Sequence, residues 1–405
     1  MGACFSRGQD LRKAPVVTVS NQSRDAIRRL EQKEADMEKF VWATIAKGRP
    51  YTDAEFPPEQ SSLFDARIDV DVDQQAFSTF SWRRASEIFQ NPQVFEGGVH
   101  PNDINQGQLG DCYFLAALSS LAEFEERVKA MFVTKEVNAA GIYMVKMFIN
   151  GNEQPVIVDD YLPCKRNGSA AFATSRDGEL WVSILEKAWA KLHGTYARTE
   201  GGLPCFAANH IMGVPSESFN HASIESTDEF YNMLKSADAR AFTMMAASHG
   251  QGENRNDAGV ISGHAYSLIQ IVEFKHQGKD VRLLQLRNPW GSGEWQGDWS
   301  DKSPLWTPAL KKQCGFVDGD DGMFFIELND YLEHFAWTSI CVENNDLKYI
   351  HSQLYHSFNK TLDDSPMPQA FFSFTLSAEI DFSKYAFAIS VLQQGDRLKQ
   401  YRLKE

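Results

Sequence analysis

The sequence predicts an α+β fold in which a helical half precedes a β-rich half. Two apolar helices indicate the first half: one runs from Tyr113 to Ala122 and is apolar on nearly every side, and the other spans Ser183–Lys191. Helices of this kind lie inside a core rather than on its surface. From about Phe242 onward, short apolar runs separated by turn residues are typical of strands. Helices and strands are therefore expected in separate parts of the chain.

Length and charge limit the classes of function. The 405 residues are enough for two or three domains. The net charge of −14, from 40 basic and 54 acidic residues, disfavours nucleic acid as a partner. Six scattered cysteines without a CxxC pair favour a reducing compartment, and there is no apolar run of membrane-spanning length and no signal-peptide core. We therefore expect a cytoplasmic protein.

The first six residues match the myristoylation pattern M-G-x-x-x-[ST], with Gly2 as the acceptor. Cys4 lies next to it and can take a palmitoyl chain. Two acyl chains give stable anchoring, whereas a single myristoyl group gives only marginal membrane binding. We expect attachment to the cytoplasmic face of a membrane. The alternative is an ordinary disordered terminus that happens to begin with Met-Gly.

A helix is predicted from Gln22 to Lys47, ended by Gly48. Its apolar side chains form one broad face, consisting of Ile27, Leu30, Met37, Val41 and Ile45. The charged residues between them form a solvated face. This segment is expected to be a spacer or docking helix without chemistry of its own.

The loop before the first buried helix presents a candidate nucleophile. The sequence Gln106–Cys112 contains two glycines and an aspartate and leads directly into the helix. Asp111 is a good N-cap residue, and Cys112 then takes the first helical position. The helix dipole and the free amides there favour the reactive thiolate over the thiol. The alternative is a buried cysteine that serves as a small apolar residue.

A cysteine nucleophile needs a base and a group that orients the base. His264 lies at the start of a long predicted strand, and Asn288 lies at the end of the next one. If the intervening turn is centred near His276, an antiparallel hairpin places the two side chains next to each other at its open end. Asn288 then binds one imidazole nitrogen and leaves the other facing Cys112. The alternative is a structural histidine in an ordinary hairpin.

Two further residues complete the candidate site. Trp290 follows Asn288 closely and is expected to shield the hydrogen bond between His264 and Asn288 from water. Gln106 precedes Cys112 by six residues and is expected to point its side-chain amide at a developing oxyanion, together with the backbone N–H of Cys112.

These blocks resemble the catalytic blocks of the calpain family of cysteine proteases. The three blocks are Gln106–Cys112, Gly263–Ser267 and Arg287–Gly291, and the supporting matches are Tyr51–Pro57, Trp82–Arg84 and Leu185–Ala188. The resemblance covers roughly residues 51–345. It implies a two-lobed, papain-like core, with Cys112 in a helical lobe and His264 and Asn288 in a β-rich lobe. It also implies limited proteolysis of intracellular proteins.

The resemblance divides the chain into four parts. An acylated N-terminal segment with a helix covers residues 1–50, the first protease lobe 51–200, and the second lobe 201–345. Residues 346–405 resemble the beginning of the β-sandwich that follows the core in the family, and we expect a partial or truncated domain there.

Calcium is the cofactor that the resemblance implies, and no organic cofactor is expected. Two ions close the lobes in related cores. Matched position by position, the first site consists of Gly98, Asp103 and Glu186, and the second of Glu294, Asp301 and Asp321. A loop carbonyl and carboxylates suit a hard cation. Met323 stands where the family tends to place a further acidic ligand, so calcium dependence is left open.

The sequence therefore predicts a calcium-dependent type of cysteine endopeptidase acting on protein substrates. One alternative is a membrane-associated scaffold or regulatory protein that keeps the fold without cutting. Another is acyl transfer of the transglutaminase type, which usually pairs Cys and His with Asp rather than Asn. The sequence does not identify the substrate, the oligomeric state or a regulatory subunit.

Overall fold

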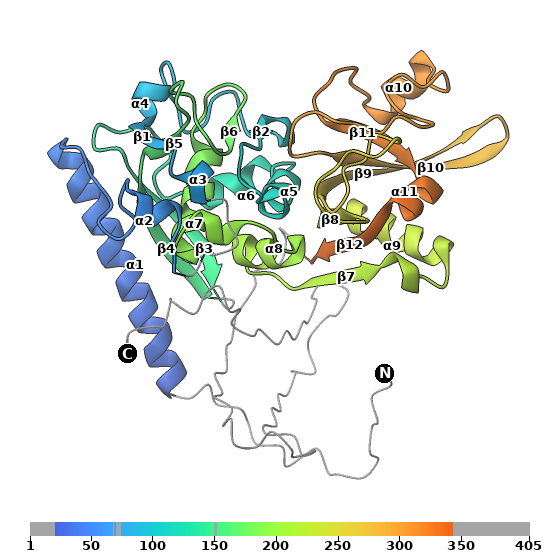
Figure 1. Ribbon diagram of the computed structural model, residues 1–405. Coiled ribbons are helices and arrows are strands. Elements are labelled where there is room, and N and C mark those ends of the chain that lie inside the picture. Colours follow the sequence, from blue (N-terminus) through green and yellow to red (C-terminus); the bar gives the residue numbers. More distant parts are fainter. Residues whose placement is uncertain (1–20, 68, 70–73, 150–151, 343–405) are drawn as a thin grey trace, which may run out of the picture. The chain divides into compact units, whose positions relative to one another are not determined.

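The β-rich half forms a six-stranded antiparallel sheet in the computed structural model, which describes residues 21–67, 69, 74–149 and 152–342 (Figure 1). The strand order is β11-β10-β9-β8-β12-β7. The bounds are Ser216–Asn220 for β7, Thr243–Ser248 for β8, Ala265–His276 for β9, Lys279–Arg287 for β10, Met323–Glu327 for β11 and Phe335–Cys341 for β12. Four of these strands were predicted, whereas β7 and β12 were not.

The hairpin of β9 and β10 differs in register from the prediction. His276 pairs with Lys279, so the turn consists of Gln277 and Gly278, both with positive φ, as tight hairpin turns require. A β-bulge between Gln285 and Leu286 then shifts the pairing. A bulge adds one residue to one strand and re-aims the side chains beyond it. It lies just before the end of β10, where the candidate site begins.

Helix α5, Cys112–Leu121, is the central helix and every residue in it is buried. It contacts β8 and β9 of the sheet and also helix α8, Pro204–Met212. The hydroxyl of Ser267 on β9 donates to the carbonyl of Ala116 at 2.8 Å, and that of Ser120 donates to the carbonyl of Met244 on β8 at 2.6 Å. The predicted buried helix is confirmed, and these bonds fix it against the sheet.

The second predicted helix is α7, Trp181–His193, which is also buried throughout. The predicted pair of strands between the two helices is β3, Ile142–Ile149, with β4, Asn152–Asp159. Shorter elements complete this half: α2 (Gln60–Leu63), α3 (Gln74–Phe77), β1 (Ser81–Arg84), α4 (Ala85–Ile88), η2 (Pro101–Asp103), β2 (Ile104–Asn105), α6 (Glu125–Ala130), β5 (Tyr161–Cys164), β6 (Thr174–Ser175) and η3 (Ala197–Thr199). The elements that flank the sheet strands are η4 (His221–Ser223), α9 (Thr227–Ala239), α10 (Pro308–Cys314) and α11 (Leu328–His334).

The predicted N-terminal helix is present as α1, Asn21–Lys47, and Gly48 follows it with a φ of 62°. Val41 is fully buried, and Met37 and Ile45 pack in the same cluster. That cluster includes residues of β3 and β4, so this part of α1 packs on the β3–β4 hairpin.

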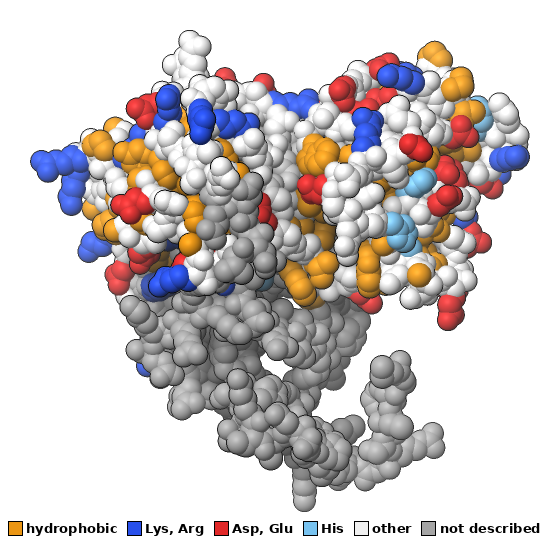
Figure 2. All heavy atoms as spheres, viewed as in Figure 1, with side chains coloured by type: hydrophobic (Ala, Val, Ile, Leu, Met, Phe, Trp, Pro, Cys, Tyr) orange, Lys and Arg blue, Asp and Glu red, His pale blue; other side chains and the backbone are white. Residues whose placement is uncertain are grey.

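The surface carries no single dominant charge on the face shown in Figure 2, where acidic and basic side chains are interspersed. No helix within the described ranges combines the length and the apolar composition needed to cross a membrane. The five cysteines among the described residues form no disulfide with one another. The predicted partial sandwich at 346–405 lies outside the described residues.

A buried ion pair fixes α7 to β4. Lys187 Nζ lies 2.5 Å from Asp159 Oδ1, and both side chains are fully buried. The ammonium group also donates to the Tyr161 carbonyl, and Asp159 accepts from the backbone amide of Asp53 at 2.7 Å. Burial lowers the pKa of Lys187, which shows that desolvation opposes this charge.

We expect Lys187→Met to destabilise the protein by about 3–5 kcal/mol, because it leaves the Asp159 carboxylate buried without its cation. Urea unfolding followed by tryptophan fluorescence measures this loss. Lys279→Met, on the exposed turn of the β9–β10 hairpin, is the control and should change stability by less than about 0.5 kcal/mol. Equal effects of the two substitutions would contradict the role of the pair.

Candidate active site

Cys112 is the first residue of α5 and is 7% exposed. The amides of Phe114 and Leu115 donate to the carbonyl of Asp111, which starts the helix. Asp111 takes the N-cap position, but its side chain makes no capping hydrogen bond, so the predicted carboxylate cap is wrong. Its carboxyl group is fully buried next to Glu186, and this burial raises its pKa well above the usual range.

His264 and Asn288 are joined by a hydrogen bond of 2.9 Å between Nε2 and Oδ1. His264 is 1% exposed and Asn288 is fully buried. The amide of Asn288 is oriented because its Nδ2 donates to the carbonyl of Gly293 at 3.1 Å. Asn288 Oδ1 therefore accepts the Nε2 proton, which leaves Nδ1 as the second functional atom of the imidazole.

The bulge in the pairing of β9 with β10, where Ile269 of β9 is the extra residue, shifts the register by one residue before these side chains meet. Regular pairing ends at Arg287 opposite Ser267, and Asn288 lies beyond it. The Asn288 backbone amide donates to the carbonyl of Gly322. This bond fixes the backbone of Asn288 beyond the end of β10. The Asn288 side chain can therefore reach His264.

Glu253 is the third side chain near Cys112 and His264, and it was missed in the sequence. Its Oε1 lies 3.1 Å from His264 Nδ1, and its side chain is 38% exposed. The candidate ligand atoms of Cys112, Glu253 and His264 all lie within 4.8 Å of one another. Glu253 belongs to the loop between β8 and β9, and its φ of 46° is unusual for a residue other than glycine.

Trp290 and Gln106 border this group. The ring centroids of Trp290 and His264 are 4.9 Å apart, and the Trp290 amide donates to Asn288 Oδ1 at 3.1 Å. The backbone amide of Gln106 donates to the carbonyl of Pro289 at 3.0 Å, and its side-chain Nε2 donates to the carbonyl of Leu109 at 2.7 Å. The loop before Cys112 is thereby bonded directly to the segment after Asn288.

Electrostatics in this geometry favours the thiol form of Cys112. Burial, with a contribution from Glu253, raises the pKa of Cys112 to about 12, although a hydrogen bond from the backbone of Ala265 acts in the opposite direction. The hydrogen bond with His264 lowers the pKa of Glu253. The imidazole therefore has a carboxylate as its charged partner rather than a thiolate, in contrast to the activation expected from the helix dipole.

The residues predicted for the first calcium site have separate hydrogen-bond partners and surroundings that differ from one another. Asp103 accepts from the backbone of His100 at 2.7 Å, and burial raises its pKa. Glu186 instead accepts from the backbone amide of Ala173 at 2.9 Å, and burial raises its pKa to about 8. Gly98 has a φ of 113°. Burial and the negative charge of Asp103 both raise the pKa of Glu179.

The residues predicted for the second calcium site form an acidic group. Glu294 Oε1 accepts from the backbone amides of Asp321 and Gly322. Burial and the charge of Glu294 raise the pKa of Asp301 to about 7, and the Asp301 Oδ2 atom is buried without a hydrogen-bond partner. Asp321 Oδ2 accepts from Asn102 at 2.7 Å. Carboxylate oxygens are the ligands that a hard cation prefers, but these three side chains do not gather their oxygens around one point as the ligand atoms near Cys112 do.

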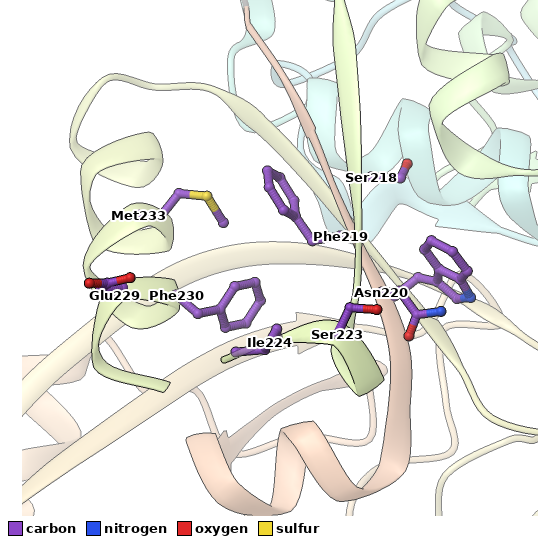
Figure 3. Close-up of a pocket in the computed structure, with 9 residues that line it drawn as sticks. Ser218, Phe219, Asn220, Ser223, Ile224, Glu229, Phe230 and Met233 are labelled. Carbon is purple, nitrogen blue, oxygen red and sulfur yellow. The ribbon is translucent and has the colours of Figure 1, made fainter. Parts of the chain in front are cut away.

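A pocket with a cavity volume of about 470 Å³ lies elsewhere, between β7, α9 and β12 (Figure 3). Its lining residues are Ser218, Phe219, Asn220, Ser223, Ile224, Glu229, Phe230, Met233 and Trp337. None of them belongs to the group around Cys112, so the pocket carries no part of the candidate chemistry.

Comparison with known sequences identifies the family. The profile described as calpain family cysteine protease matches residues 51–342. The chain belongs to the calpain family. The calpain-type cysteine protease DEK1 of Zea mays is 38% identical over 329 residues, which cover 77% of this chain and 15% of that protein. Calpain-9 of Homo sapiens is 33% identical over 308 residues, covering 73% of this chain and 43% of that protein.

Calpain-A of Drosophila melanogaster is 35% identical over 323 residues, covering 76% of this chain and 38% of that protein. This calpain-family chain thus spans less than half the length of each of these relatives. Family membership confirms the predicted resemblance and places the chain among thiol proteases, which are hydrolases. The mixed helical and β architecture agrees with the expected calpain core.

Two predicted features of this calpain-family chain lie outside the described residues. They are the acylation sites Gly2 and Cys4, and both stay predictions from the sequence pattern.

The buried pair of Asp111 and Glu186 leads to a pH-dependent prediction. Burial raises the pKa of Glu186 to about 8 in the folded state. At a pH between the ordinary pKa of a glutamate and about 8, the folded protein therefore keeps this proton, whereas the unfolded chain has lost it. Stability from this pair is therefore fully present at acidic pH and is lost as the pH rises towards about 8. Glu186→Gln should remove this loss, so the variant should gain stability over the parent at alkaline pH.

Thermal unfolding from about pH 5 to about pH 9 measures the difference. Glu136→Gln, an exposed substitution, is the control and should follow the parent curve. Parallel curves for the parent and Glu186→Gln would show that folding does not raise the pKa of Glu186.

Proposed function

We propose that the chain is an endopeptidase that cleaves protein substrates with Cys112 as nucleophile, His264 as base and Asn288 as the residue that orients His264. The observation that supports this most directly is that the two ring nitrogens of His264 have different partners. Its Nε2 is bonded to Asn288 Oδ1, and its Nδ1 faces the group that includes the Cys112 sulfur. A cysteine nucleophile requires this division of roles.

In the proposed reaction, His264 Nδ1 takes the proton of the Cys112 thiol, and the thiolate attacks the carbonyl carbon of the scissile peptide bond. The backbone N–H of Cys112 and the Gln106 side chain stabilise the oxyanion. Leu109 uses only one hydrogen of the Gln106 amide nitrogen, so a second hydrogen is left to donate. His264 then protonates the leaving amine, and a water molecule hydrolyses the thioester.

Glu253 opposes this reaction in the described geometry, because its carboxylate takes up His264 Nδ1. The proton transfer from Cys112 therefore requires Glu253 to move off the imidazole. Trp290 next to the ring shields the bond between His264 and Asn288 from water, and this bond keeps the same nitrogen facing Cys112 when Glu253 moves.

We expect Cys112→Ala to abolish cleavage of casein and labelling by a thiol-directed epoxide, because no other group replaces the sulfur in this site. Hydrolysis measured by release of labelled peptides tests this expectation. Cys205→Ala is the matched control, since Cys205 is a free, partly exposed thiol outside the group, and it should retain the parent activity. Retained cleavage by the Cys112→Ala variant would contradict the proposed mechanism.

Calcium is proposed as the activating cation, held by Glu294, Asp301 and Asp321. Support comes from the raised pKa of Asp301 and its unpartnered buried oxygen. When bound, the ion supplies the positive charge that these carboxylates lack. Gly98, Asp103 and Glu186 are a weaker set, because Glu186 is engaged by Ala173 and lies next to Asp111. Two protease lobes, 51–200 and 201–345, and membrane attachment through Gly2 and Cys4 complete the proposal.

Asp301→Asn should weaken calcium binding at least about 10-fold, because it removes a charged ligand from the group. Calorimetric titration with calcium and the calcium dependence of casein hydrolysis both measure it. Asp257→Asn, in an exposed loop, is the control and should leave both curves unchanged. Full activity of the parent in the presence of a chelator would remove calcium from the proposal.

A further inference from the structure

We propose that Cys112, His264 and Glu253 form a zinc site that inhibits the peptidase when it is occupied. This inference rests on the proposed function for its inhibitory meaning, whereas the metal site itself rests on geometry. Among the described residues, these three make up the one group of cysteine, histidine and acidic side chains whose ligand atoms gather within 4.8 Å. A thiolate, an imidazole and a carboxylate are a ligand set typical of zinc.

The separation of the His264 nitrogen and the Glu253 oxygen is close to that of two ligands on one tetrahedral ion. Zinc binds nitrogen and oxygen at about 2.0–2.1 Å and sulfur at about 2.3 Å, so its ligand atoms lie roughly 3.3–3.6 Å apart. His264 Nδ1 and Glu253 Oε1 are 3.1 Å apart, and the sulfur lies within the same 4.8 Å group. Small side-chain adjustments therefore bring the three atoms to one ion, and water takes the fourth position.

The second ligand shell is already present. A histidine that binds a metal through one nitrogen usually donates the other N–H to a neighbouring acceptor, which fixes its tautomer. His264 Nε2 is bonded to Asn288 Oδ1 in this way, and Asn288 is held by Gly293. Nδ1 is consequently the nitrogen that is left to bind zinc together with Cys112 and Glu253.

The charges also favour a cation at this point. If the imidazole carries its one proton on Nε2, its Nδ1 lone pair points at a carboxylate oxygen of Glu253. Two acceptors 3.1 Å apart repel each other unless a proton or a metal ion lies between them. Zinc satisfies both and takes the place of the Cys112 thiol proton, which leaves to the solvent.

Glu253 distinguishes this site from a bare pair of cysteine and histidine. It comes from the loop between β8 and β9, which is closed by a bond from the Gly263 amide to the His249 carbonyl and by the bridge of Arg255 with Ile261. The loop presents the carboxylate from outside the catalytic elements. Zinc held by all three ligands blocks the sulfur and the imidazole together, so substrate attack stops.

The experiment is a titration of the full chain with Co²⁺, a spectroscopic substitute for zinc, in chelator-treated buffer with a phosphine reductant. We expect one equivalent to bind with a charge-transfer band from thiolate to cobalt, and Zn²⁺ to displace it. Cys112→Ser should abolish the band. Glu253→Gln should keep the band but weaken the affinity at least about 10-fold.

Cys205→Ser and Glu333→Gln are the matched controls, being a second accessible thiol and an exposed carboxylate, and each should titrate like the parent. A band that survives in Cys112→Ser, or equal affinities of Glu253→Gln and the parent, would overturn the site. Zinc should also stop casein hydrolysis over the concentration range in which it displaces cobalt, and a chelator should restore it.

The two proposals fail in different ways. A parent that hydrolyses casein but gives no thiolate–cobalt band contradicts the zinc site alone. A parent that shows the band but never hydrolyses casein contradicts the proposed function and the inhibitory role, and it leaves the metal site supported by its own measurement.

Discussion

The burial of α5 against β8 and β9 is the constraint on which the candidate site depends. A helix without a polar face must be covered on every side, and Cys112 at its first position is brought to the start of β9 as a result. The backbone of Ala265 then reaches the sulfur, and the adjacent His264 enters the same space. Buried Arg287 adds to this, since it donates to the carbonyl of Ile104 at 2.5 Å and so ties β10 to the loop before the helix.

That same burial reverses the expected charge state of the thiol. The dipole of a helix is worth about 0.3–1 kcal/mol to a charge at its N-terminus. Burial and the neighbouring acids raise the pKa of Cys112 from 9.0 to about 12, which corresponds to about 4 kcal/mol in favour of the thiol. Desolvation is therefore the larger effect. In the proposed reaction, His264 takes up the thiol proton and supplies the positive charge that stabilises the thiolate.

The sequence was sufficient for features set by apolar periodicity and insufficient for those set by tertiary contacts. Continuous apolar residues predicted α5 and α7, and alternation predicted β8 to β11. The predicted closeness of His264 and Asn288 required only a hairpin, but the bulge after Gln285 changed the register in a way that no local pattern shows. The pairing of Asp111 with Glu186 and the position of Glu253 depend on segments distant in sequence, so propensity and spacing could not reveal them.

The acidic group and the Glu253 loop are connected through the backbone, which links two features that the sequence shows only as separate loops. The Gln296 amide donates to the carbonyl of Ala258 at 2.9 Å, and the side chain of Arg255 reaches the carbonyl of Glu294 at 3.4 Å. Gly259 packs so closely on that carbonyl that a Cβ atom would collide with it. The Glu294 side chain also accepts from the amides of Asp321 and Gly322, so Glu294 joins the Glu253 loop to the segment that carries Asp321. The loop that carries Glu253 thus contacts the backbone of Glu294, whose carboxylate is proposed to bind the activating cation.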